Sequence, residues 1–181
     1  ITNVQSLAPL ARTGYDVVIP GPTCSRMLKV EYPELVPGDD ARAVAARTFD
    51  ACEYLMKLYA EGKLDTRFSH NPGRIAYHAP CHLRDQNIGF KSRDLLELIP
   101  GCEIEVVTQC SAVDGTWGMK REYYELSMKT AGKLIDGLRA TGAMVVASDC
   151  PLAGLRIEQG LGRKASHPVE ILRDAYGLRA E

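Results

Sequence analysis

Four short apolar runs, each rich in valine, isoleucine or alanine, alternate with longer stretches of helical periodicity. The runs around Val17–Ile19 and Met144–Ala147 are apolar without alternation, which is typical of strands covered on both faces, as in a parallel sheet. The four predicted strands are Tyr15–Pro20, Arg74–Ala79, Glu103–Thr108 and Ala143–Ser148.

Between these runs, apolar residues recur at the three- and four-residue steps of an amphipathic helix. One such face covers residues 45–59, after the expected caps Asp39 and Asp40, and Gly62 is placed to end it. A second face covers residues 124–138. Shorter helices are expected at Arg93–Ile99, Leu152–Gln159 and Val169–Tyr176. Strands that alternate with helices predict an α/β fold with a mainly parallel sheet flanked by helices.

A faint internal repeat suggests how the chain is divided. The segment TGYDVVIP at 13–20 resembles TGAMVVAS at 141–148, and each is followed by a cysteine-bearing loop and a predicted helix. We therefore predict that residues 1–70 are the C-terminal part of a first repeat plus a linker helix. Residues 71–181 would form a complete second repeat. A chain that begins at Ile1 is expected to be part of a longer protein.

Composition narrows the class of protein. The 181 residues are 45% hydrophobic and 25% charged, with a net charge of −1, so the total charge predicts no nucleic-acid partner. No apolar run approaches the roughly 20 residues of a membrane-spanning helix. Six cysteines at irregular spacings in a chain of this size indicate free thiols in a reducing cytoplasm.

Three of the cysteines share one structural context. Cys81, Cys110 and Cys150 each follow a predicted strand by a few residues. If these strands are parallel, the three thiols lie at the same edge of the sheet, where open α/β sheets bind their ligands. Thiolates are the ligands of soft metals and iron–sulfur clusters. The alternative is three unconnected structural cysteines.

The other three cysteines have different contexts. Cys52 lies on the apolar stripe of a predicted helix, which favours a packing role, and Cys102 precedes its strand at the opposite sheet edge, which favours a structural one. Cys24 follows a strand and could be a ligand left over from the first repeat, but it has no obvious partner cysteine.

The segments around the three aligned cysteines resemble a known family. These segments are YHAPCH (77–82), QCSAVDGTWGMK (109–120) and VVASDC (145–150), with PTCSRMLKVEYPEL (22–35) upstream and His167-Pro168 downstream. They are similar to the cysteine-rich "CCG" domain that heterodisulfide reductase carries in one of its subunits. The same domain occurs in iron–sulfur subunits of anaerobic glycerol-3-phosphate dehydrogenase, glycolate oxidase and lactate-utilisation systems. The resemblance covers nearly the whole chain.

The resemblance implies a site built from one cysteine, a Cys-Cys-Gly motif and a Cys-x-x-Cys motif. Cys81, Cys110 and Cys150 match its first members, but Ser111 and Ala153 stand where two further cysteines belong. The resemblance also implies that Gly115 and Gly118 form the glycine-rich turn beside the cofactor. Three thiolates would hold one conventional [4Fe-4S] cluster with a fourth ligand, or the cluster has been lost with the missing cysteines.

Candidate fourth ligands are His82, Ser111, His78 and Asp114. His82 is next to Cys81, whereas His78 ends a strand and is as readily explained by packing. A Cys₃His set would equally suit a zinc ion.

These features give one leading function and two alternatives. The leading function is an iron–sulfur electron-transfer subunit, cytoplasmic or peripheral to the inner face of the membrane. Its partners would be a flavoprotein dehydrogenase or other redox subunit and a quinone or membrane-anchored acceptor. The alternatives are a degenerate domain that acts as a non-catalytic interaction module, favoured by Ser111 and Ala153, and a zinc-stabilised structural domain.

Overall fold

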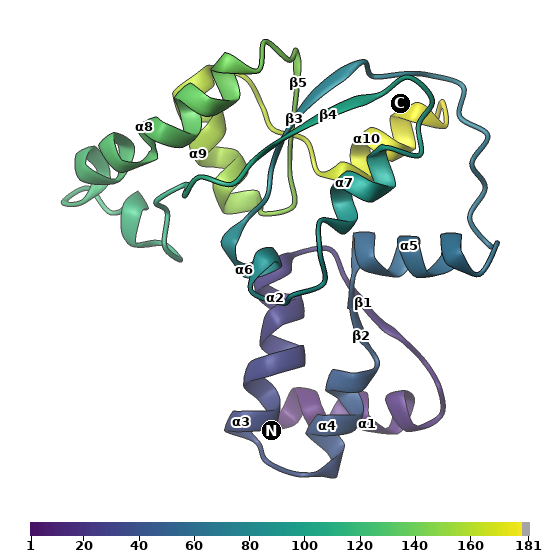
Figure 1. The fold of residues 1–181 in the computed structure, drawn as a ribbon. Helices are drawn as coiled ribbons and strands as arrows, with labels where there is room; N and C mark the ends of the chain where they lie inside the picture. Colours follow the sequence, from purple (N-terminus) through teal and green to yellow (C-terminus); the bar gives the residue numbers. More distant parts are fainter. Residues whose placement is uncertain (179–181) are drawn as a thin grey trace.

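A computed structural model describes residues 1–178 and contains two small parallel sheets (Figure 1). Two strands form the first sheet, and three strands in the order β4-β3-β5 form the second. The strands are β1 (Val17–Ile19), β2 (Thr48–Asp50), β3 (Arg74–His78), β4 (Glu103–Val107) and β5 (Val145–Ser148). The predicted α/β class and all four predicted strands are confirmed, and β2 is additional.

Helices connect and cover the strands. The predicted helices at 93–99, 124–138, 152–159 and 169–176 are present as α7, α8, α9 and α10, and the helix predicted after the strand at 15–20 is present as α2. The predicted face over residues 45–59 is divided between α4 and α5, and α1, α3 and α6 are additional. The bounds are α1 Thr2–Arg12, α2 Pro22–Arg26, a π-helical turn η1 Met27–Glu31, α3 Tyr32–Leu35, α4 Asp39–Ala46, α5 Ala51–Ala60, α6 Cys81–Arg84, α7 Lys91–Leu96, a 3₁₀ turn η2 Trp117–Met119, α8 Tyr124–Ala140, α9 Pro151–Leu161 and α10 Pro168–Ala175.

The expectation of one continuous helical face over residues 45–59 is wrong. Helix α4 stops at Ala46, and Thr48 begins strand β2, which pairs in parallel with β1. A new helix then starts because the Asp50 side chain accepts a hydrogen bond from the Cys52 N–H, while Glu53 accepts one from the Asp50 N–H. This reciprocal pair is a capping box. Similarly, Asp39 and Asp40 lie in the first turn of α4 and do not cap it.

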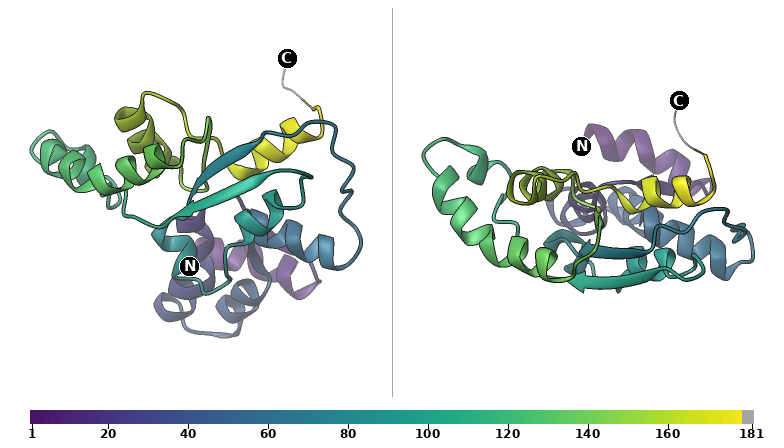
Figure 2. Two further views of the ribbon diagram at one scale, coloured as in Figure 1. Left: turned by 45° about the horizontal axis from the view of Figure 1, so that its top comes forward. Right: turned by 90° about the horizontal axis from the view of Figure 1, so that it is seen from above.

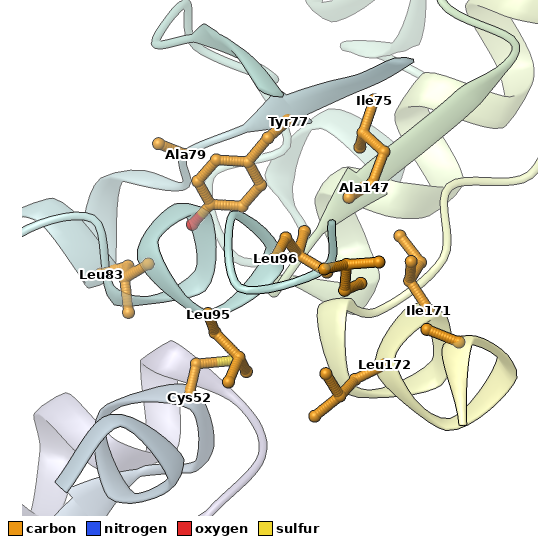
Figure 3. Close-up of a cluster of buried hydrophobic side chains, with 12 residues drawn as sticks. Cys52, Ile75, Tyr77, Ala79, Leu83, Leu95, Leu96, Ala147, Ile171 and Leu172 are labelled. Carbon is orange, nitrogen blue, oxygen red and sulfur yellow. The ribbon is translucent and has the colours of Figure 1, made fainter. Parts of the chain in front are cut away.

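Both faces of the three-stranded sheet are covered. Ile75 and Tyr77 of β3 pack on one face with leucines of α7 and α10, and Cys52 of α5 belongs to the same cluster (Figure 3). Ala76 points to the opposite face, where α8 and α9 supply the core. This alternation along β3 is the two-residue period of a strand. Figures 1 and 2 show α8 and α9 on one side of the sheet and α5 and α7 on the other.

The strands of this sheet end in register. His78, the last residue of β3, lies opposite Val107, the last residue of β4, and opposite Ser148, the last residue of β5. The three loops that follow the strands therefore leave the sheet at the same edge.

The first sheet faces this same edge. Thr23 of α2 shares a 2.9 Å hydrogen bond with His82 of α6, and Gln86 donates to the Pro22 carbonyl at 3.1 Å. His167 donates from Nε2 to the Pro20 carbonyl just after β1, at 2.8 Å. Helices α2 and α6 consequently lie side by side between the two sheets (Figure 1).

Candidate functional site

The aligned strand ends carry three free cysteines, which we call the thiol edge: Cys81, Cys110 and Cys150. Cys81 lies three residues beyond the end of β3, Cys110 three beyond the end of β4, and Cys150 two beyond the end of β5. The thiols of Cys81 and Cys110 are exposed and that of Cys150 is half-buried. Parallel pairing and register together bring the three predicted ligands to one edge, as the sequence predicts.

Each thiol is positioned by a different local structure. Cys81 is the first residue of the short helix α6, directly after Pro80. Cys110 lies in an irregular segment, where its sulfur accepts a hydrogen bond from the Ala112 N–H at 3.3 Å. Cys150 is the N-cap of α9. Hydrogen bonds to sulfur are among the factors that set the potential of a bound iron–sulfur cluster.

The buried His78 side chain forms hydrogen bonds with residues near two of the thiols. Its Nε2 donates to the Gln109 carbonyl at 3.2 Å, and its Nδ1 therefore accepts from the Ser148 hydroxyl at 3.0 Å. Burial lowers the pKa of His78 to about 4, so the ring is neutral at pH 7. With both ring nitrogens occupied by the loops next to Cys110 and Cys150, His78 holds those loops, and the alternative of a metal ligand is not supported by this geometry.

The remaining candidate ligands lie around the thiols. His82 is half-buried and uses Nδ1 to bond Thr23, which leaves its Nε2 without a protein partner in the described part of the chain. Ser111 is half-buried directly after Cys110, and Asp114 is exposed with a left-handed backbone at φ 46°.

The two glycines of the predicted turn have different surroundings. Gly115 is exposed with φ +62°, a conformation that side chains disfavour, and its Cα faces open space. Gly118 is buried, and a Cβ there would lie 2.2 Å from Ser127 Oγ. Gly118 therefore allows this segment to pack tightly on α8. Gly118 lies in the 3₁₀ turn η2, whose N-cap residue Thr116 makes no side-chain capping hydrogen bond.

A second group of polar residues lies between the two sheets, and we call it the carboxyl cluster: Asp50, Cys52, Asp149, Tyr77 and Ser92. Asp149 accepts from the Tyr77 hydroxyl at 2.6 Å and from the Ser92 hydroxyl. The Cys52 thiol lies 3.8 Å from Asp149, and ligand atoms of Asp50, Cys52 and Asp149 all lie within 4.8 Å of one another. All five residues are buried.

Burial controls the ionisation of this cluster. Burial, together with the charge of nearby Asp149, raises the pKa of Asp50 to about 7. Burial also raises the pKa of Asp149 and, well above its usual value, that of the Cys52 thiol. Protonated groups with internal hydrogen bonds explain the cluster without a metal ion. Sequence reasoning missed it, although the Asp50–Glu53 spacing was a visible capping signal.

Cys52 and Cys102 have the structural surroundings that the sequence predicts, and the structure also locates Cys24. Cys52 is fully buried in the core. Cys102 donates to the Gly73 carbonyl at 3.2 Å, and burial raises its pKa to about 11, which disfavours the thiolate that a metal needs. Cys24, which has no obvious partner in the sequence, is exposed on α2, beside the helix that begins with Cys81.

The spacing of the thiol edge can be compared with two kinds of metal centre. Within residues 1–178, Asp50, Cys52 and Asp149 of the carboxyl cluster form the only group of three His, Cys, Asp or Glu residues whose ligand atoms all lie within 4.8 Å of one another. A tetrahedral zinc with Zn–S of about 2.3 Å needs sulfurs roughly 4 Å apart. A multi-iron cluster spreads its thiolates more widely, which is compatible with three sulfurs that do not all lie within 4.8 Å of one another.

A cavity of about 390 Å³ opens beside Cys150. It is lined by Ser148, Gly154, Lys164 and His167 among others. Cys81 and Cys110 do not line it. The cavity is therefore not shared by the three thiols.

The fold and the site together define a class of protein. It is an α/β domain in which cysteines follow parallel strands that end in register, that is, a cysteine-rich domain. Residues 75–158 match the CCG cysteine-rich domain family, so the chain contains a domain of that family. This range contains all three residues of the thiol edge, so the predicted family is confirmed.

Curated relatives extend the similarity to the rest of the chain. A subunit of anaerobic glycerol-3-phosphate dehydrogenase from Escherichia coli is 30% identical over 97% of this chain and 44% of its own length. A subunit of the CoM/CoB fumarate reductase from Methanothermobacter marburgensis is 27% identical over 90% of this chain and 32% of its own. A probable glycolate oxidase iron-sulfur subunit from Bacillus subtilis is 24% identical over 96% and 42%.

The chain thus spans less than half the length of these relatives. Their names support an iron–sulfur cofactor and a redox complex as the setting of this domain. Among the described residues, no helix is long and apolar enough to cross a membrane.

Proposed function

We propose that this chain is the cluster-bearing part of an iron–sulfur electron-transfer subunit in a dehydrogenase or reductase complex. The observation that carries the proposal is the thiol edge, in which Cys81, Cys110 and Cys150 follow three strands that end in register. Its free thiols are soft ligands. In the proposed complex, electrons arrive from a flavoprotein partner and leave toward a quinone or membrane-anchored acceptor.

The bound group is proposed to be a [4Fe-4S] cluster, which would accept and release one electron at a time. Cys81, Cys110 and Cys150 would supply three thiolates, and His82 or Ser111 the fourth ligand. Ala153 is fully buried, so the position of the family's last cysteine is closed to any ligand from outside. The protein's own contribution is to hold the thiols at one edge and to fix the loops through His78.

We also propose that the chain combines two repeats. Residues 1–70, with β1 and β2, would be the end of a first CCG-like repeat plus a linker helix, and residues 71–181 the second. The similar course of the two sheets and their facing edges support this division.

A second function is favoured by Ser111 and Ala153. Loss of two family cysteines would leave a domain that keeps its fold and its partner-binding surface without a cluster. A zinc-stabilised domain is the third candidate, and it is less favoured because the three sulfurs do not all lie within 4.8 Å of one another.

Metal analysis with a visible spectrum, on protein purified and reconstituted without oxygen, tests the proposal. Iron and sulfide in near-equal amounts, with broad absorption that dithionite bleaches, are the expected result. A colourless protein with stoichiometric zinc would replace the proposal by the structural-zinc alternative. A protein that binds neither iron nor zinc would support the second function, a non-catalytic interaction module.

A further inference from the structure

Arg156 of α9 is a buried cation that has no acidic partner among residues 1–178. It is only 1% exposed, and its side chain is among the largest fully buried ones in the described part of the chain. Its Nη2 donates to the Gly118 carbonyl at 2.7 Å and to the Ser127 hydroxyl at 2.8 Å. Within residues 1–178, its Nε and Nη1 have no hydrogen-bond partner. The Tyr124 ring lies 5.2 Å from the guanidinium carbon.

The partners of Arg156 lead directly to Cys110. Ser127 uses its own hydroxyl hydrogen to donate to the Ala112 carbonyl at 2.6 Å. The Ala112 N–H in turn donates to the Cys110 sulfur at 3.3 Å. One guanidinium thereby fixes both ends of the segment between residues 112 and 118, on which the position of the Cys110 thiol depends.

Arg156 also belongs to the helix that begins after Cys150. Helix α9 runs from Pro151 to Leu161, with Cys150 as its N-cap. The contacts of Arg156 therefore couple two arms of the thiol edge that are 40 residues apart in sequence, Cys110 and Cys150. Gly118 is needed for this contact, because a Cβ there would lie 2.5 Å from the Ala112 carbonyl oxygen and 2.2 Å from Ser127 Oγ.

The charge of Arg156 requires an explanation as well as its position. A guanidinium stays protonated in proteins, and burying it without a carboxylate carries a large desolvation cost. Two carbonyl or hydroxyl oxygens and an aromatic ring compensate part of that cost. A cluster held by three thiolates carries net negative charge, and positive charge near it favours the reduced form.

We infer that Arg156 is a positioning residue of the cluster site, which fastens the Cys110 segment to the Cys150 helix and supplies an uncompensated positive charge behind the thiolates. This inference rests on the proposed function. No feature of the sequence pattern distinguishes Arg156 from the exposed basic residues around it.

The test compares Arg156→Gln, which removes the charge, with Arg156→Lys, which keeps it. Arg163→Gln is the matched control, because Arg163 bonds the Ala143 carbonyl at the opposite end of β5. Three quantities are measured: amide hydrogen exchange of residues 110–119 in the metal-free protein, the rate of iron release to a chelator, and the midpoint potential of the cluster.

Arg156→Gln should speed exchange in residues 110–119, release iron about 10-fold faster and lower the potential. Arg156→Lys should also loosen the segment but keep the potential close to that of the wild type. Arg163→Gln should leave all three unchanged. The lysine variant retains the buried charge, so it serves where the glutamine variant fails to fold.

Unchanged exchange, iron release and potential in a folded Arg156→Gln protein would overturn the inference while leaving the proposed function intact. An equal fall of the potential in the lysine and glutamine variants would overturn the electrostatic part. A wild-type protein that takes up no cluster would overturn the proposed function and the electrostatic part together, and the exchange measurement alone would then decide whether Arg156 fastens the segment.

Discussion

The thiol edge and the carboxyl cluster both lie at the ends of parallel strands, but the first consists of free cysteines and the second is built around buried carboxyl groups. Both form where parallel strands end, and Asp149 of the carboxyl cluster is adjacent in sequence to Cys150 of the thiol edge. Asp149 is fully buried with two hydroxyl donors, whereas Cys150 is half-buried and caps α9. Two neighbouring residues therefore have different surroundings: Asp149 is enclosed in the core, and Cys150 is partly open to solvent.

The comparison of two cysteines shows what burial decides. Cys52 and Cys110 both follow strands by two or three residues. Cys52 is enclosed by core side chains and the buried Asp149, and burial raises its pKa well above the usual value. Cys110 is exposed, with a backbone N–H directed at its sulfur. A cysteine after a strand is therefore a candidate ligand only where its thiol reaches the open edge.

Substitution of the thiol edge should have the largest effect. Cys81→Ala, Cys110→Ala and Cys150→Ala should each abolish most iron binding in anaerobic reconstitution, because a three-thiolate site has no spare ligand. Cys52→Ala is the control. It should keep the iron and lose about 1 kcal/mol of unfolding free energy, since it removes a buried sulfur.

Iron content and denaturant unfolding of the metal-free proteins measure this contrast. The unfolding free energy of Cys81→Ala should stay within about 0.5 kcal/mol of the wild type, because its side chain is exposed. Full iron occupancy in Cys110→Ala would remove that residue from the site.

The carboxyl cluster should make stability depend on pH. The folded pKa of Asp50, about 7, is above the value of 3.8 that it takes when unfolded. Between these values the unfolded state has lost a proton that the folded state keeps, so stability falls as pH rises from about 4 to 7. Asp50→Asn should reduce this fall by up to about 4 kcal/mol and still cap α5.

Unfolding free energies of both proteins between pH 4 and 8 provide the test. His78, whose folded pKa is about 4, acts in the opposite direction, since its contribution grows as pH rises from about 4 to 6.5. It titrates alike in both proteins, so the difference between them reports on Asp50 together with Asp149, whose charge interacts with that of Asp50. Parallel pH profiles would show that Asp50 is ionised in the folded protein.

The two sites also differ in how far the sequence predicts them. The thiol edge follows from local signals, because strands β3, β4 and β5 are apolar runs and each cysteine stands just beyond its run. Only parallel pairing had to be assumed to bring the thiols together. The carboxyl cluster depends on contacts such as Tyr77 with Asp149, which are 72 residues apart, and no local pattern predicts such a pair.

Strand β2 shows where helical periodicity fails as a predictor of secondary structure. Phe49, Cys52 and Met56 continue the helical spacing that begins at Ala45, so the pattern predicts one helix. Pairing of Thr48 with Val17 overrides that spacing, since the strand hydrogen bonds are made with a segment that periodicity does not consider. Arg156 was missed for a similar reason, because its burial depends on the packing of α8 against α9.

A smaller effect than that of Asp50 is expected at the contact between Tyr77 and Asp149. Tyr77→Phe removes one of the two hydroxyl donors of a buried carboxyl group and changes little else in the core. A buried acceptor that loses its donor destabilises the protein by about 2 kcal/mol. The variant should keep the iron content of the wild type, because Tyr77 faces α7 and not the thiol edge.

Tyr59→Phe is the matched control for this change, since Tyr59 is 44% exposed. Its unfolding free energy should equal that of the wild type, and both variants are compared by denaturant titration at pH 7. If Tyr77→Phe lost iron without losing stability, the carboxyl cluster would have to be counted as part of the metal centre. If Tyr77→Phe kept both its iron and its stability, Asp149 would have found another hydrogen-bond donor. Burial alone would then distinguish the carboxyl cluster from the thiol edge.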